Sequence, residues 1–148
     1  MSLLDSHDLI EIKLYYKYIT TSNGKKVIIL EDKKAEELLK DEEKAKEVEI
    51  LETQWDMPNW KEQNEIWRET DSASSKSVDS LTGDKPVPFF VYREIIIKKC
   101  LKSWNLTINK EPVPVSSENI DKLPGHVVIA LFDKFNGFTE FSEEELGN

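Results

Sequence analysis

The sequence predicts an α+β fold, in which an N-terminal β-hairpin, a helix and a third strand precede a small C-terminal helical bundle. Two observations predict it: apolar and polar residues alternate on either side of Asn23-Gly24, whereas apolar residues recur at helical spacing from Phe89 onward. In chain order we expect a β-β-α-β module over residues 1–55, a helical module over 56–137 and an acidic tail over 138–148.

The two N-terminal strands follow from alternation and turn chemistry. Ile10, Ile12 and Leu14 alternate with charged residues, as in a strand with one buried face. Asn-Gly supplies the positive φ angles that a tight hairpin requires, so the chain should return as a second strand over Val27 to Leu30.

The period then changes over residues 31–49. Ala35 and Leu38 mark a thin apolar stripe, while glutamates and lysines occupy the other faces. This pattern predicts a solvated helix lying on the sheet. Val48 to Trp55 should form the third strand, and its open sheet face should pack on the helices that follow.

The helical module should begin with a helix capped by Asp56, because Pro58 is tolerated in a first helical turn. On this helix Trp60, Asn64 and Trp67 fall on one side. The Ser-rich segment 70–86 has no helical or strand period, which predicts a mobile loop.

Residues 89–105 predict the central core helix, with an apolar stripe that runs from Phe89 through Cys100 to Trp104. Cys100 lies on that stripe, which favours a small buried side chain over a reactive thiol.

The C-terminal part predicts two helices. Ser116 or Ser117 should cap a short helix through Leu123 that Pro124-Gly125 ends. A last helix over 126–135 should close at Asn136-Gly137, and the acidic tail should fray.

Composition narrows the classes of partner. The chain has 148 residues and a formal charge of -9, which argues against binding to nucleic-acid phosphates. An acidic inhibitor that mimics nucleic acid is one alternative. A single cysteine, no basic leader and no long apolar stretch predict a cytoplasmic protein without a disulfide or a membrane span.

The sequence predicts a protein that is not an enzyme. It lacks the phosphate-binding, dinucleotide-binding, hydrolase and metalloprotease motifs. His7 and His126 lie near opposite ends of the chain, so a shared metal site is not expected. No catalytic, cofactor or metal residue is therefore assigned, and an enzyme with an unfamiliar site stays as an alternative.

The tryptophans are the residues that remain to be explained. They could fill the core, as we expect for Trp104, but the helix that carries Trp60 and Trp67 offers only Ile66 as an aliphatic neighbour. Rigid aromatic side chains are favoured interface anchors. The partner-binding residues that we predict are Trp55, Trp60, Asn64 and Trp67.

A family resemblance follows from the order of motifs. The chain has W-x4-WKEQN ending at Asn64, a Ser-rich gap, YREIIIKKCLKSWN ending at Asn105, and then VPVSSENIDKLPGHVVIALFDKF. Over about residues 54–135 this order resembles small phage tail assembly chaperones and related tail-assembly proteins. The matching positions are Trp60, Asn64, Trp104-Asn105, Ile120, Leu123 and Pro124.

The resemblance implies a role in binding aggregation-prone tail components, such as tape-measure or tube subunits, in the infected host cytoplasm. The N-terminal hairpin and charged helix depart from such chaperones, which are often mainly helical. A structural protein of the virion tail or neck is therefore the close alternative. Self-association is left open.

Overall fold

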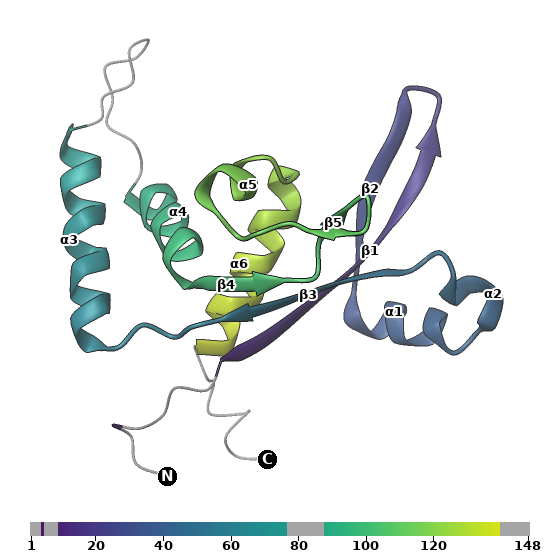
Figure 1. Ribbon diagram of the computed structural model, residues 1–148, viewed down its shortest axis with the longest axis horizontal. Helices are drawn as coiled ribbons and strands as arrows, with labels where there is room; N and C mark the ends of the chain where they lie inside the picture. Colours follow the sequence, from purple (N-terminus) through teal and green to yellow (C-terminus); the bar gives the residue numbers. More distant parts are fainter. Residues whose placement is uncertain (1–3, 5–8, 77–87, 140–148) are drawn as a thin grey trace.

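The computed structural model describes Leu4, residues 9–76 and residues 88–139 (Figure 1). The fold is α+β, as predicted. Its main sheet is antiparallel and has the strand order β2-β1-β3-β4. The four strands are β1 (Ile10–Thr21), β2 (Gly24–Leu30), β3 (Glu49–Trp55) and β4 (Leu101–Trp104).

The hairpin and the third strand are confirmed. Thr21 pairs with Gly24 across a two-residue turn, and of the Asn-Gly pair only Gly24 has a positive φ. The expectation that Asn23 also takes a positive φ is therefore wrong. The Thr21 hydroxyl donates to the Gly24 carbonyl at 2.8 Å, which adds a bond that closes the turn.

The charged segment forms two helices in place of one: α1 (Asp32–Leu39) and α2 (Glu42–Ala45). Asp41 interrupts the segment because its carboxylate accepts from the backbone amides of Glu43 and Lys44, as an N-cap residue does. Ala35 of α1 is buried against one face of the hairpin, with Leu30 and Val48.

The other face of the sheet carries the main core. Side chains from β1 and β3 pack there with the C-terminal helices, so both predicted modules contribute to one hydrophobic cluster. The helices are α3 (Trp60–Lys76), α4 (Pro88–Cys100), α5 (Ser117–Asp121) and α6 (Gly125–Thr139). Figure 1 shows α6 beside the sheet, α4 next to it, and α3 at the edge of the molecule.

Three predicted helix limits are wrong. The α3 helix begins at Trp60, because Asn59 and Glu62 cap each other reciprocally: the Glu62 amide donates to Asn59 Oδ1 at 2.8 Å and the Asn59 amide donates to Glu62 Oε1 at 3.2 Å. Asp56 is thus not the cap.

The prediction of a loop over 70–86 is wrong for residues 70–76, which are helical. The rest of that predicted loop lies outside the described residues and stays untested. The α6 helix continues past Asn136-Gly137 to Thr139.

The predicted core helix ends at Cys100, and Trp104 lies on β4 rather than on a helix. The reason is the free edge of β3, whose backbone groups pair with β4.

A small hairpin of β5 (Thr107–Ile108) and β6 (Glu111–Pro112) follows, and it was not predicted. Ser116 caps α5, as predicted. The predicted tail lies almost wholly beyond Thr139, outside the described residues, so its expectation stays a prediction.

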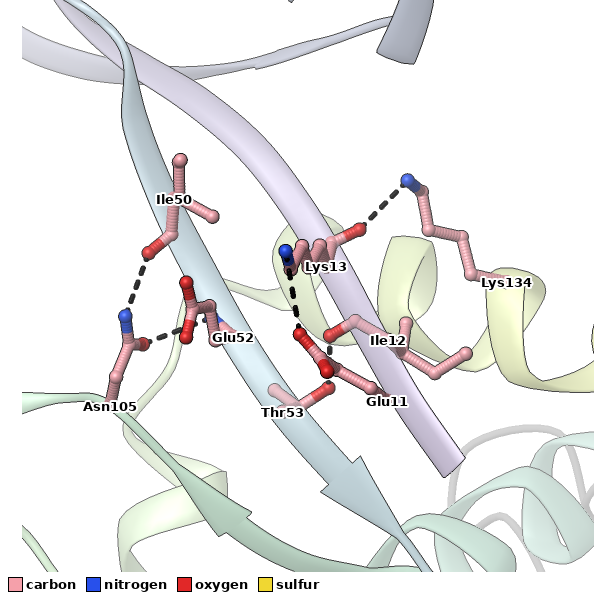
Figure 2. Close-up of polar contacts among 8 residues, drawn as sticks. All are labelled: Glu11, Ile12, Lys13, Ile50, Glu52, Thr53, Asn105 and Lys134. Carbon is pink, nitrogen blue, oxygen red and sulfur yellow. Dashed lines mark hydrogen bonds and ion pairs between the residues drawn. The ribbon is translucent and has the colours of Figure 1, made fainter. Parts of the chain in front are cut away.

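Just after β4 ends, Asn105 forms hydrogen bonds to the same edge of β3. Its side-chain amide donates to the Ile50 carbonyl and accepts from the Glu52 amide, both at 3.0 Å (Figure 2). Trp104 is held by a 2.6 Å bond from its indole N–H to the Val113 carbonyl. Trp104 and Asn105, two positions of the resemblance to tail-assembly proteins, therefore each make hydrogen bonds within the fold.

Candidate interaction surface

The outer face of α3, defined here as Trp60, Lys61, Asn64, Trp67 and Arg68, is the strongest candidate for an interaction surface. Trp60 is 74% exposed and Trp67 is 49% exposed, although both are large apolar side chains. Their ring centroids lie 6.0 Å apart at an interplanar angle of 87°, an edge-to-face pair. Asn64 lies one turn from each and is half-buried.

The opposite side of α3 explains why the indoles point outward. Ile66 is buried, Thr70 and Ser74 lie on the same side, and α4 is the helix against which they pack. The Gln63 side chain reaches the Tyr92 hydroxyl of α4 at 3.5 Å, and Lys99 pairs with Glu69 at 2.6 Å. Because α4 packs on the side of α3 that carries Ile66, the exposed indoles lie on the side turned away from the core.

Trp55 does not belong to this surface, so its assignment as a partner-binding residue is wrong. It is 0% exposed and stacks on Phe135 of α6 at 4.6 Å. Its indole N–H donates to the Thr53 hydroxyl at 2.8 Å, which in turn donates to the Ile12 carbonyl at 2.7 Å. The strand alternation of Leu51, Thr53 and Trp55 is the sequence signal that could have placed it in the core.

Charges of both signs lie beside the indoles. Lys61 and Arg68 are both exposed and lie next in sequence to Trp60 and Trp67. Neither forms an ion pair with another described residue. The nearby carboxylates of Glu62 and Glu69 are instead engaged in the helix cap and in the pair with Lys99. The outer face therefore presents two aromatic rings beside two cations, while Glu65 and Asp71 lie three or four residues from Lys61, Trp67 and Arg68 on the same helix.

The hollows on other parts of the surface include two that are lined mainly by the C-terminal helices. A groove of about 400 Å³ between α4, α5 and α6 contains the exposed Phe90 and Ile129. A narrower crevice of about 170 Å³ joins the start of α3 to the C-terminal half of α6, with Met57, Pro58, Phe135 and Asn136 in its wall. Sequence reasoning identified neither hollow, because each one combines segments that are distant in the chain.

Cys100, a described residue, lacks the exposed surroundings that a nucleophilic thiol needs. This side chain is 3% exposed, and burial raises the pKa of its thiol to about 11, so it stays protonated at neutral pH. His126 is exposed, with its Nε2 2.9 Å from the Val27 carbonyl. Over the described ranges, no three histidine, cysteine or carboxylate side chains gather as a metal site. None of the helices in those ranges combines the length and apolar character of a membrane span.

Comparison with known proteins gives no relative: the chain matches no protein-family model, no curated protein and no solved structure.

Proposed function

We propose that this is a non-catalytic phage protein of tail assembly, chaperone-like, that binds another polypeptide through the outer face of α3. The observation that carries the proposal is the exposure of Trp60 and Trp67 on a helix whose other side is fixed to α4. Tryptophan is enriched among the residues that dominate binding energy, and exposed apolar groups of this kind mark interaction sites.

The energetics support a binding role for these rings. A tryptophan can bury about 150–250 Å², and each apolar Å² removed from water contributes roughly 25 cal/mol. Covering the exposed parts of two rings therefore gives several kcal/mol before the costs of association. The edge-to-face contact also holds each indole in place, so less side-chain entropy is lost on binding.

The geometry also limits the kind of complex. A stable interface buries about 1,200–2,000 Å² in total, more than two indoles provide. The partner should therefore extend over neighbouring surface, and the exposed Met57 lies only three residues before Trp60. A tail component with an aggregation-prone apolar surface, a tube or tape-measure subunit in the infected cytoplasm, is the partner that we propose.

The experiment is affinity purification of the tagged protein from phage-infected cells, with the captured proteins identified by mass spectrometry. We expect tube or tape-measure subunits with the natural chain and at least a tenfold loss with the double variant Trp60→Ala, Trp67→Ala. Ile108→Ala, which removes an exposed apolar side chain on β5, is the matched control and should retain capture. Equal capture by the double variant would contradict the assignment of the surface, and capture of no tail protein would contradict the role.

Analysis of purified particles separates the two versions of the role. A chaperone should be absent from mature virions, whereas a component of the tail or neck should be present at a fixed copy number. Either result is compatible with the contact through α3, because the surface chemistry is the same.

A further inference from the structure

One half of β1 has an edge that no described strand covers. β1 pairs with β3 over residues 10–16 and with β2 over residues 15–21. On the side of β2, residues 10–14 therefore face no strand among the described residues. A hollow of about 550 Å³ lies along this edge, with side chains of β1, α1 and α6 in its wall.

The backbone of this edge is oriented to pair with another strand. Lys134 of α6 donates from its Nζ to the Lys13 carbonyl at 2.8 Å, on the side of β1 away from β3 (Figure 2). Alternate residues of a strand direct their N–H and C=O groups to the same side, so Glu11 points its backbone groups to this edge as well. Tyr15, the next residue in the series, is the first that β2 pairs with. Glu11 and Lys13 are thus two positions at which a strand could add.

Lys134 occupies this edge in the single chain. Its Nζ also pairs with Asp32 of α1 at 2.5 Å and lies 6.0 Å from the centroid of the Tyr15 ring. An added strand needs the Lys13 carbonyl as an acceptor for its own N–H, so it must displace the ammonium group. Lysine at a sheet edge is a common protection against strand addition.

The side chains of the edge are complementary to those of a second copy. In an antiparallel pair centred on Ile12, Glu11 of each copy lies opposite Lys13 of the other. Opposite charges directly across a strand pair stabilise it. The other charged side chains around the hollow are Asp32, Glu36 and Lys134, which belong to α1 and α6 rather than to the strands that would pair.

We propose that the free edge of β1 is a pairing surface for a second copy of the chain, and that Lys134 keeps it closed. Because β2 covers the edge from Tyr15 onward, only residues 10–14 of each copy can pair. So short a contact is small beside the roughly 1,200–2,000 Å² that stable interfaces bury. The contacts of Lys134 are therefore strong enough to decide between the single chain and the pair. This inference is independent of partner binding through the outer face of α3.

The first test removes Lys134 and its ion-pair partner together. The double variant Asp32→Asn, Lys134→Met, called here the open-edge variant, frees the Lys13 carbonyl and keeps the net charge around the hollow. Sedimentation velocity from micromolar to millimolar concentration should show self-association at least tenfold tighter than that of the natural chain. The control Glu118→Gln, Lys122→Met removes an exposed ion pair at α5 and should behave as the natural chain does.

A single substitution checks the same point with less change to the fold. Asp32→Asn keeps the lysine but removes its ion pair, so the ammonium group leaves the edge more readily. We expect this variant to self-associate to a degree between the natural chain and the open-edge variant. Circular dichroism verifies that each variant is folded.

Charge reversal in the open-edge variant tests the register of the pair. Glu11→Lys alone, or Lys13→Glu alone, places like charges opposite each other in a pair of identical copies, so self-association should fall to the level of the natural chain. A mixture of the two reversed chains restores opposite charges at both positions and should associate again. Loss of folding cannot produce this recovery.

Amide hydrogen exchange locates the contact in the associated open-edge variant. The amides of Glu11 and Lys13 should exchange more slowly as protein concentration rises, because they become bonded to the second copy. The amide of Ile12 faces β3 and should change little.

Equal self-association of the open-edge variant and the natural chain would overturn the proposal. Association that persists in each reversed chain alone would also overturn it, because the contact would then lie elsewhere on the surface. The variant Trp60→Ala, Trp67→Ala, which tests the proposed function, should leave self-association unchanged. Failure of one inference is therefore distinguishable from failure of the other.

Discussion

Asn105 and Glu52 are joined by two hydrogen bonds that continue the sheet after β4 has ended. The Asn105 backbone amide donates to the Glu52 carbonyl at 3.2 Å. The Glu52 amide donates to Asn105 Oδ1 at 3.0 Å, the bond that Figure 2 shows. A side-chain oxygen thus takes the place of a backbone carbonyl. The arrangement blocks part of an edge that could otherwise pair with another chain.

Asn105→Ala should lower the free energy of unfolding by about 1–2 kcal/mol, because two side-chain hydrogen bonds to β3 are lost at an exposed position where water replaces them in part. Urea denaturation measures the change. Lys102→Ala, an exposed substitution on β4, is the control and should stay within about 0.5 kcal/mol of the natural chain. Equal effects of the two substitutions would contradict the edge-sealing role.

Thr53→Val should cost about 2–3 kcal/mol of stability. The substitution keeps the shape of the side chain but leaves the indole N–H of Trp55 and the carbonyl of Ile12 without the hydroxyl that links them in the buried core. Thr53→Ser retains the hydroxyl and should cost less. If serine destabilises more than valine in chemical denaturation, packing of the methyl group rather than the hydrogen bonds is the dominant contribution.

The strands β1 to β3 could be predicted because their signals are local. Alternation fixes which side chains share a face, and a Gly at the turn fixes the hairpin. The fourth strand could not be predicted in the same way. Residues 101–104 continue the apolar spacing of α4, and their strand conformation depends on the free edge of β3, about fifty positions earlier in the chain.

The sequence identified two tryptophans of the candidate surface from local spacing but misplaced a third. The lack of aliphatic neighbours around Trp60 and Trp67 is visible in a helical window, and both are exposed. Trp55 was grouped with them by proximity in sequence, although it ends a strand with the opposite periodicity. Partners such as Phe135, which covers Trp55, come from the last helix and cannot be inferred from local spacing.

Lys110→Gly should stabilise the protein by about 1 kcal/mol. Asn109 and Lys110 have φ angles of 52° and 68° in the turn between β5 and β6, a conformation that glycine adopts without steric conflict. Thermal denaturation measures the gain. Lys110→Val is the opposing variant and should destabilise, since a β-branched side chain tolerates positive φ poorly. A loss of stability in the glycine variant would show that chain entropy outweighs the relief of strain.

Cys100 should resist alkylation in the native state. Burial raises the pKa of its thiol to about 11, and its side chain is enclosed by the core. At pH 8 we expect labelling by iodoacetamide to be at least 100-fold slower in buffer than in denaturant, as measured by intact mass. Because the folded-state pKa is raised, this group favours folding below pH 9 and loses that contribution as the pH rises toward 11. Rapid labelling of the native chain would contradict this burial.

The contrast between Trp55 and Trp60 tests the main structural distinction among the tryptophans. Trp55→Ala removes a ring that is wholly enclosed and stacked on Phe135, so the cavity should cost about 3–5 kcal/mol. Trp60→Ala removes a ring that is mostly in water and should cost less than about 1 kcal/mol. For a chain of this size each kcal/mol lowers Tm by roughly 2–4 °C, so scanning calorimetry resolves the two cases. If Trp60→Ala lowers Tm as far as Trp55→Ala, the ring supports the fold, and the outer face of α3 is not free to bind a partner.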